Sequence, residues 1–476
     1  MPTTLRSFAL ATALIGTVAC APARLDGPSP APGRADESRF LDTLQERTFR
    51  WFWDSGSPET GLVPDRWPSP SFSSIAAVGF GLTAYPVGVE RGHVTREQAR
   101  ERTLATLRFF WRAPQGPEAR GRTGHRGFFY HFLDMKEGLR YRDVELSTID
   151  TALFIAGALA AAAYFDGPHP GEQEIRRLAD QLYRRVEWDW FQVDSPLVSM
   201  AWRPEREFDE ARYEGYDEAM LLYVLALGSP THPIQATAWP AFTSTYSWGD
   251  FHGQEHVNFA PLFGHQYSHV WIDTRGIQDA YMRERGIDYF ENSRRATLSQ
   301  RAYAIENRMR WKGYDGQVWG LTASSGPVDA THTIDGVERT FHTYWARGAA
   351  RGDVRDDGTI SPTAVGGSIP FAPELTIAAL QAMRARYGEH VFRKYGFVDA
   401  FNPTLDRAVA VKHGRIVPGV GWFEDDYLGI DQGPILLMAE NHRSGLVWRL
   451  MRSNPHVVRG LCRAGFTGGW LKGRCR

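Results

Sequence analysis

Hydrophobic helices alternate with amphipathic helices along this chain, and no other feature of the sequence restricts its fold as strongly. Residues 71–92, 147–167 and 216–228 are apolar on all sides, whereas 95–111 and 170–188 carry charges on one face. A helix that is apolar all round must be covered on every side, while an amphipathic helix can face water. The alternation therefore predicts an inner ring of helices wrapped by an outer ring.

The remaining helical segments fit the same arrangement. We expect helices over 38–54, 294–307, 373–388 and 433–452, with Ser38 as a cap and Pro373 in a first turn. Thr95 and Gln98 have capping-box spacing at the start of another. The predicted fold class is all-α, an (α/α)6 toroid formed by one domain over residues 38–455. Two helical domains are the alternative, although no fixed-period repeat supports a solenoid.

The first twenty residues are typical of an export signal. One Arg precedes a short apolar run that ends in "TVAC", which resembles a bacterial lipobox with Cys20 as the lipidated residue. Cleavage after "ACA" by the ordinary signal peptidase is the alternative. Residues 21–37, rich in Pro, Ala and Gly, read as a flexible tether. We expect a periplasmic or outer-membrane lipoprotein that touches the membrane only through its lipid anchor.

Two further cysteines lie in the predicted C-terminal tail, residues 456–476. With Cys20 lipidated, Cys462 and Cys475 are free to form a disulfide in an oxidising compartment, although their spacing alone does not prove it.

Net charge and aromatic content restrict the kinds of partner. The chain has 54 Lys and Arg against 55 Asp and Glu, so no overall field attracts nucleic acid or an anionic membrane. Its aromatic fraction of 13% suits a large core, and it equally suits sugar rings, whose C–H faces stack on Trp and Tyr.

Glu218, beside Asp217 and Tyr216, is placed in the first turn of a predicted inner helix. One interpretation is ordinary stabilisation of the helix N-terminus, which predicts that both acids are exposed. The other is a general acid turned towards the closed inner side, where apolar neighbours raise its pKa.

Asp150 and Glu145 have a similar layout at the start of another inner helix. Ser147 and Asp150 are three residues apart, as in an acidic capping box, so capping is the simpler interpretation and contact with a substrate hydroxyl the alternative.

The third candidate acid, Asp431, stands shortly before Pro434 at the last inner helix. Its simplest role is that of an N-cap. We expect the nearby Glu424, Asp425 and Asp426 to be charges on a loop surface, one of which can reach the cleft.

Three inner helices thus begin with a carboxylate at the same end. In a ring of hairpins, Glu218, Asp150 and Asp431 would converge on one cleft walled by the long connections, which cover 112–146, 189–214, 229–272 and 308–372. Carboxyl groups on the two sides of an acetal oxygen are what glycoside hydrolysis requires.

A metal site is a weaker hypothesis. His265, His269 and Asp273 stand four residues apart in a row, but the chain has no HExxH motif. It also has no GxSxG element for a serine nucleophile. We expect neither a metal nor a cofactor.

Long motifs resemble one family. They are "TGLVPDR", "SIAAVGFGLTAY", "GFFYHFLD", "STIDTAL", "YDEAMLLY", "LFGHQYSHVWIDTRG", "WGLTASSGP", "DGTISPTAVGGSIPFAPE" and "GIDQGPILLMAENHRSGLVW". In this order, from residue 39 to 453, they resemble the glycoamylase-like domain of glycoside hydrolase family 144, the bacterial endo-β-1,2-glucanases. They are also similar to the transglycosylase domain of cyclic β-1,2-glucan synthases.

The resemblance implies hydrolysis of β-1,2-glucan with inversion, with Glu218 as the general acid and Asp431 as the general base. Substrate-binding residues carried over from the motifs are Asp150, His265, Gln266, His269 and Trp319. Glu145, Tyr216 and Trp422, which lie beside these motifs or acids, are added as candidates for substrate binding. Relatives are thought to relay protons through a substrate hydroxyl or a water chain, so the two carboxyls need not keep the usual separation of about 6.5–9.5 Å.

The chain departs from the family at one motif. Ser325 stands where "TASDGP" commonly has an acid, and an unusual insert follows at 328–355. We expect the insert to border the cleft and to affect a subsite, chain-end preference or linkage. The sequence leaves open an inverting hydrolase, a transglycosylase, and a surface glycan-binding protein without activity. We expect a monomer.

Overall fold

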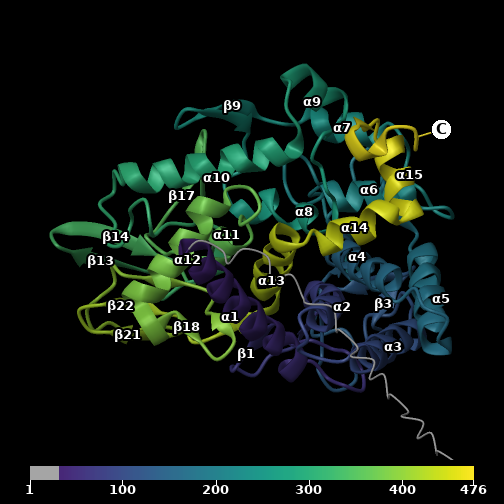
Figure 1. The fold of residues 1–476 in the computed structure, drawn as a ribbon, viewed down its shortest axis with the longest axis horizontal. Helices are drawn as coiled ribbons and strands as arrows, with labels where there is room; N and C mark the ends of the chain where they lie inside the picture. Colours follow the sequence, from purple (N-terminus) through teal and green to yellow (C-terminus); the bar gives the residue numbers. More distant parts are fainter. Residues whose placement is uncertain (1–31, 476) are drawn as a thin grey trace, which may run out of the picture.

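The computed structural model describes residues 32–475, with side chains from Asp36 onward, and is rich in helices (Figure 1). The helices are α1 (Pro32–Ser55), α2 (Ile75–Glu90), α3 (Arg96–Arg112), α4 (Thr148–Tyr164), α5 (Pro170–Arg185), α6 (Met220–Gly228), α7 (Ala238–Ser244), α8 (Tyr267–Trp271), α9 (Ala280–Arg285), α10 (Tyr289–Glu306), α11 (Pro362–Gly366), α12 (Pro373–Tyr387), α13 (Gly429–Arg443), α14 (Leu446–Ser453) and α15 (Pro455–Arg463). No helix of this range combines the length and hydrophobicity that a membrane span needs.

Buried apolar helices alternate along the chain with amphipathic helices, as the sequence predicts. The apolar helices α2, α4 and α6 are buried almost throughout, and α3 and α5, which follow α2 and α4, lie outside them with charged faces. α13 packs against α1, α2, α8 and α11, and Figure 1 shows it in the middle of the molecule. The predicted inner and outer sets of helices are therefore present.

α2 and α4 are in backbone contact at two glycines. A Cβ atom on Gly79 would lie 2.3 Å from the carbonyl oxygen of Leu153, and one on Gly157 would lie 2.1 Å from that of Gly79. Because real Cβ atoms do not approach so closely, only glycine permits this separation of the two helices.

Short antiparallel strands occupy the connections, and the all-α expectation omitted them. A five-stranded sheet has the order β3 (Gly124–His125), β4 (Phe128–Tyr130), β6 (Leu146–Ser147), β7 (Ala201–Arg203), β8 (Glu207–Phe208), and a three-stranded one the order β20 (Phe401–Asn402), β22 (Gly421–Phe423), β21 (Arg415–Val417). The two-stranded pairs are β1 (Arg66–Trp67) with β23 (Tyr427–Leu428), β2 (Ser73–Ser74) with β5 (Phe132–Leu133), β9 (Trp248–Phe251) with β10 (Gln254–Val257), β11 (Ile277–Gln278) with β24 (Thr467–Gly468), β12 (Ala323–Ser325) with β15 (Tyr344–Ala346), β13 (Ala330–Ile334) with β14 (Val337–Phe341), β16 (Gly348–Ala350) with β17 (Asp353–Arg355), and β18 (Phe392–Arg393) with β19 (Gly396–Phe397).

Three of these strands lead directly into inner helices. β2 runs into α2, β6 into α4 and β23 into α13, and each is paired with a strand from another connection. Ser74 and Ser147, the last residues of β2 and β6, are also the N-caps of the helices that follow. The strand pairs thus fix where α4 and α13 begin, which is where Asp150 and Asp431 lie.

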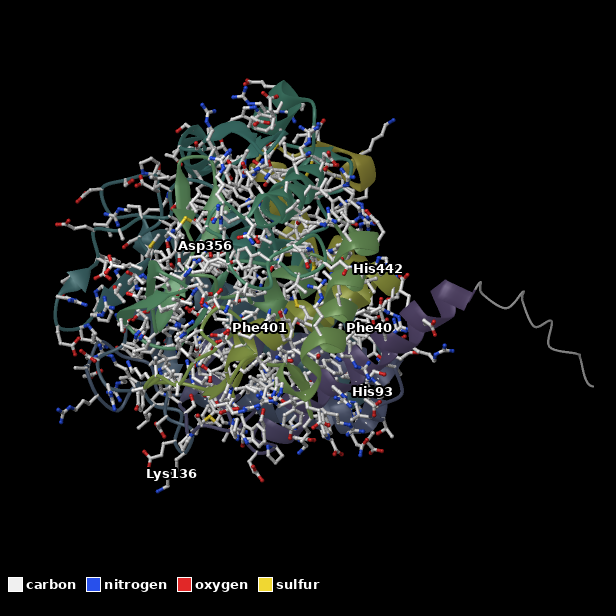
Figure 2. All side chains as sticks on the ribbon, turned by 90° about the vertical axis from the view of Figure 1, so that its left-hand side faces the viewer. Phe40, His93, Lys136, Asp356, Phe401 and His442 are labelled. Carbon is white, nitrogen blue, oxygen red and sulfur yellow. A yellow bond between two sulfur atoms is a disulfide. The ribbon has the colours of Figure 1, made fainter. Side chains whose placement is uncertain are left out.

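The buried aromatic side chains are mostly core residues. Trp51, Trp188 and Trp271 belong to the part of the core around α2, α4 and α6, and Trp319 and Trp422 to the part around α11 and α12. In Figure 2, Phe401 lies within the body of the molecule, whereas Lys136 projects from its lower edge.

Several predicted boundaries shift. α1 begins at Pro32, so the last residues of the expected tether are helical and Ser38 is not a cap, while the signal and lipobox lie outside the described residues. The expected helix 433–452 is two helices, α13 and α14, because Gly445 between them takes a left-handed φ of 66°. Residues 456–475 belong to the fold: α15 packs on α6, and β24 pairs with β11.

The disulfide that the sequence left open is present, and the predicted capping box is confirmed. Cys462 and Cys475 are bonded, with their Cα atoms 5.3 Å apart. The hydroxyl of Thr95 accepts from the backbone N–H of Gln98, whose side chain accepts from the N–H of Thr95 in return.

Candidate active site

The structure brings the three candidate acids to one cavity. The cavity has a volume of about 230 Å³ and combines carboxyl groups with an apolar lining. It is lined by His131, Ile149, Asp150, Leu153, Glu218, Phe263, Tyr267, Ala323, Tyr344, Leu428, Ile430 and Asp431. Other hollows of the described surface, such as one of about 730 Å³ around Arg47 and Arg415, contain no comparable group of acids.

Glu218 enters the cavity from the turn before α6, two residues ahead of the helix rather than in its first turn. Ser268 holds this turn because its hydroxyl donates to the carbonyl of Glu218 at 2.7 Å and accepts the N–H of Leu221 at 2.9 Å. Asp217 is buried and accepts the N–H of Ala219, so the expectation that both acids are exposed is wrong.

Burial, and to a smaller extent the negative charge of Asp150, raise the pKa of Glu218 to about 7. The same desolvation, together with the charge of Glu218, holds the pKa of Asp217 well above its usual range. With this pKa, a large share of the Glu218 carboxyls is protonated at neutral pH, which suits a general acid.

Asp431 lies in the first turn of α13 and does not cap it, since the N-cap position belongs to Leu428. It is 3% exposed, and its Oδ2 atom has no hydrogen-bond partner among the described residues. Burial and the neighbouring Asp399 raise the pKa of Asp431 well above its ordinary value, while the positive charge of Arg66 acts in the opposite direction.

Further acids surround this pair, contrary to the expectation that Glu424 and Asp426 are surface charges. Both are buried, and burial followed by the charges of Asp399 and Asp426 raises the pKa of Glu424 to about 8. Only Asp425 follows the expectation: it is half-buried and pairs with Arg393 and Arg415. The backbone N–H of Ser69 donates to Asp426, and the N–H groups of Asp425 and Asp426 donate to Glu424, so both buried carboxyls have backbone partners.

Arg66 is the cation nearest to these acids. Its guanidinium lies 3.4 Å from Asp65 and 3.8 Å from Asp426. Burial raises the pKa of Asp65 in spite of Arg66. One cation thus faces several buried carboxyl groups, and protons must offset part of the remaining charge.

Asp150 takes part in the cap of α4, as the simpler interpretation predicted, and its side chain also lines the cavity. Ser147 caps α4 by accepting the N–H of Asp150, and its hydroxyl donates to the carboxylate of Asp150 at 2.5 Å. The same carboxylate lines the cavity, 3.6 Å from Nε2 of His131.

His131 is a cation in the cavity wall. Although burial opposes the charge, Asp150 and Glu145 raise the pKa of His131 to about 9. Glu145 contacts Nδ1 of His131 at 2.7 Å and Arg203 at 3.1 Å, and these partners overcome burial to lower its pKa to about 2. Glu145 therefore orients His131 from behind and does not itself line the cavity.

Four predicted substrate-binding residues are buried beside the cavity instead of opening into it. The ring of Tyr216 packs 4.8 Å from that of His265, whose Nε2 lies 3.2 Å from the carbonyl of Phe259. Gln266 donates to Ala364 and Ser368 and so ties the segment before α8 to α11. The two ring nitrogens of His269 contact Thr274 and Ser293, and burial lowers its pKa to about 3.

The two candidate tryptophans are also core residues. Trp319 and Trp422 are both 0% exposed, and the indole N–H of Trp422 donates to the carbonyl of His413. The motif of Trp319 does lie at the site, because Ala323, four residues later, lines the cavity. The aromatic rings themselves are buried in the core.

The hypothetical metal row does not form a common site. His265 and His269 contact the partners given above, and Asp273 binds Arg275 and Arg452. Within residues 32–475 no group of three or more His, Cys, Asp or Glu side chains is arranged to hold a metal ion.

Sequence reasoning missed Asp399, Asp65, His131 and Tyr344. Asp399 sits between hydrophobic residues in "GFVDAF", where a lone charged residue in an apolar run was the available signal. Tyr344 lies in the insert 328–355, which does border the cavity as expected.

The arrangement provides both functions that acetal hydrolysis needs. Glu218, with its raised pKa, stands on one element, and Asp431, with Asp399 beside it, stands on another. An apolar lining between them strengthens both interactions by excluding water.

Comparison with known proteins gives results consistent with this chemistry. A family model described as putative glucoamylase matches residues 210–455. A putative glucoamylase from Bacteroides uniformis is 32% identical and has a TM-score of 0.77, with 92% of this chain and 99% of that one covered. An endo-β-1,2-glucanase from Chitinophaga pinensis, solved with sophorotriose and glucose, is 29% identical with a TM-score of 0.76, over 91% and 99% of the chains.

A third relative is longer than this chain. It is the exo β-1,2-glucooligosaccharide sophorohydrolase (non-reducing end) of Parabacteroides distasonis, 28% identical over 459 residues. The match covers 89% of this chain but 57% of that protein.

Proposed function

This chain belongs to the glycoamylase-like family of glycoside hydrolase family 144, and we propose that it hydrolyses β-1,2-glucan or its oligosaccharides with inversion of the anomeric centre. The observation that carries the proposal is the single cavity onto which Glu218 and Asp431 open from separate elements. The names of the relatives supply the linkage, and the carboxyl groups supply the reaction type.

In the proposed mechanism Glu218 is the general acid. It donates its proton to the glycosidic oxygen as the bond from that oxygen to the anomeric carbon breaks. Its raised pKa of about 7 keeps the proton available at neutral pH.

The general base is Asp431. A water molecule attacks the anomeric carbon from the opposite face, and the proton it loses passes to the carboxylate of Asp431, whose charged form the nearby Arg66 favours. Asp150 and the His131 cation contact sugar hydroxyls at the side of the cavity, from which they orient the ring.

The finer architecture and the location of the protein belong to the same proposal. We assign the helices to an (α/α)6 toroid, supported by the alternation of buried and amphipathic helices around α13. Export as a lipoprotein anchored through Cys20 is supported by the lipobox-like "TVAC" and is compatible with the bond between Cys462 and Cys475.

The test uses the purified protein, β-1,2-glucan and two isosteric variants. We expect Glu218→Gln and Asp431→Asn each to lower kcat by about 10³-fold or more, because each removes one proton-transfer group. Proton NMR of early products should show the α-anomer, and a reducing-end assay gives the rates.

Matched controls come from the same segments. Glu214→Gln, an exposed acid four residues before Glu218, and Asp425→Asn, outside the cavity, should keep wild-type rates. Near-normal sugar release by both site variants would overturn the assignment. Redistribution of chain lengths without new reducing ends would identify a transglycosylase instead, and binding without cleavage a glycan-binding protein.

A further inference from the structure

We propose that Tyr344 is a stacking platform for a glucosyl ring at the mouth of the cavity, and that it makes the protein favour oligosaccharides long enough to reach it. The inference rests on the proposed function, because it concerns the substrate of the same site.

Tyr344 is unusually exposed for an aromatic residue that lines a cavity. Its exposed fraction is 66%, and the other large aromatic side chain exposed to a comparable degree among residues 36–475 is Trp67, at 37%. The neighbouring Trp345 instead packs on His342, with 4.2 Å between ring centroids. A large apolar ring left open to water beside a cavity indicates a binding surface.

Tyr344 lies in the wall of the cavity that holds the acids, because it is one of the lining residues together with Glu218 and Asp431. Burial raises the pKa of its phenol to about 12, and the charges of Asp399 and Asp431 add to this effect. A sugar bound between Glu218 and Asp431 would therefore have Tyr344 beside it or beside the next unit.

The strand that carries Tyr344 is linked through its partner strand to Asp399, the carboxyl beside the general base Asp431. Tyr344 is paired in register with Ser325 across β15 and β12. The backbone N–H of Ser325 donates to Oδ2 of Asp399 at 2.9 Å. The ring and the carboxyl pair are thus held on the same two-stranded support.

A fully buried ion pair anchors this support. Arg347 and Asp357 are both 0% exposed, and two guanidinium nitrogens contact the carboxylate at 2.7 and 2.8 Å. Arg347 also donates to the carbonyl of Ser324, in β12, and to that of His342, shortly before β15. The aromatic ring is therefore positioned before substrate arrives, so little conformational freedom is lost on binding.

The ligand chemistry follows from the ring. A pyranose presents a face of C–H groups, which fits an aromatic face, and the acids beside Tyr344 accept from its hydroxyls. Stacking contacts of aromatic rings contribute about 0.5–1.5 kcal/mol, which corresponds to roughly a 2–10-fold change in affinity.

The experiment measures KM and kcat for β-1,2-linked gluco-oligosaccharides of increasing length, from the disaccharide upward. For Tyr344→Ala we expect KM to rise by about 5–10-fold once the substrate is long enough to reach the platform, with kcat nearly unchanged, as for lost uniform binding. Shorter substrates should show no difference. Tyr344→Phe and Tyr344→Trp, which keep an aromatic face, should restore the wild-type KM.

Val337→Ala is the matched control, since Val337 is an exposed apolar residue of the same insert, at the tip of the β13–β14 hairpin. It should behave as wild type. Equal KM values for wild type and Tyr344→Ala at every length would overturn the inference, as would a Phe variant that behaves like the Ala variant.

Calorimetry separates this result from failure of the proposed function. Wild-type protein that releases no sugar would refute hydrolysis, and titration of the same oligosaccharides into wild type and Tyr344→Ala would still measure the platform. Weaker binding by the Ala variant supports the platform, and equal binding refutes it.

Discussion

At the scale of single residues, the site depends on carboxyl groups that burial keeps protonated. Glu218 and Glu424 both have a raised pKa, at about 7 and about 8, because desolvation penalises their charged forms. Only Glu218 faces the cavity, so the raised pKa of Glu424 reflects the crowding of acids behind Asp399 and not a proton transfer to substrate.

Glu424→Gln should therefore stabilise the protein at alkaline pH. The folded-state pKa of Glu424 lies above its ordinary value of 4.5, so the stability that the protonated carboxyl contributes is present below pH 4.5 and is lost as the pH rises through about 8. Glutamine cannot ionise, and its oxygen can still accept the N–H of Asp425. We expect Tm to rise by about 2–5 °C at pH 9 and to change little at pH 4.

The measurement is thermal unfolding of both proteins across this pH range. Asp425→Asn, which alters the half-buried neighbour, serves as the control. A Glu424→Gln variant that is equally destabilised at all pH values would show that the carboxyl is needed for packing and that its ionisation does not limit stability.

At the scale of elements, the helices could be predicted and the strands could not. The apolar runs that became α2, α4 and α6 could be read as buried helices because amphipathic helices alternate with them, and Thr95 and Pro373 marked helix starts correctly. The strands that lead into α2, α4 and α13 have two residues each, too few for any alternating pattern. Their existence follows from tertiary pairing, which no local pattern reveals.

The same reason explains which site residues were found. Glu218, Asp150 and Asp431 stand at helix starts, which the sequence marks. Tyr344 reaches the site through strand pairing with Ser325. Asp399 reaches it through a hydrogen bond from the N–H of Ser325, 74 residues earlier in the sequence. For Trp319 and Trp422 the segment was found correctly, but side-chain direction within a short strand or loop was not predictable.

The buried ion pair of Arg347, the residue after strand β15, provides a prediction at this scale. Arg347→Met leaves Asp357 as a buried unpaired charge and should lower the free energy of unfolding by about 3–5 kcal/mol. The double variant Arg347→Met with Asp357→Leu removes both charges and should recover part of that loss. Denaturant unfolding of wild type and the two variants measures the effect.

An exposed pair of the same kind is the control. Arg355→Met removes the partner of Asp353 at the surface and should change stability by less than about 1 kcal/mol. Equal losses for Arg347→Met and Arg355→Met would contradict the anchoring role of the buried pair.

At the scale of the whole molecule, the C-terminal segment closes over the helices far from the acids. α15 packs on α6, β24 pairs with β11, and Cys475 is bonded to Cys462, while none of the residues lining the cavity comes from 455–475. The segment should therefore affect local stability without affecting the reaction.

Replacing both cysteines by serine tests this separation. A bridge with a sequence separation of 13 restricts the open state by about 3 kcal/mol. Without it, we expect amide hydrogen exchange in β24 to become about 30–100-fold faster, while kcat stays at the wild-type value. A fall in kcat matching the loss of protection would show that the tail is coupled to the active site.

The contact between Gly79 and Gly157 sets a tolerance for the whole molecule. The two helices meet through hydrogen atoms and carbonyl groups, with no side chain between them that could adopt another rotamer and absorb a displacement. Asp150 lies seven residues before Gly157 on the same rod, about 10 Å along its axis. A single methyl group added at this crossing would thus shift the wall of the cleft. A substitution that does not touch the sugar would therefore lower turnover.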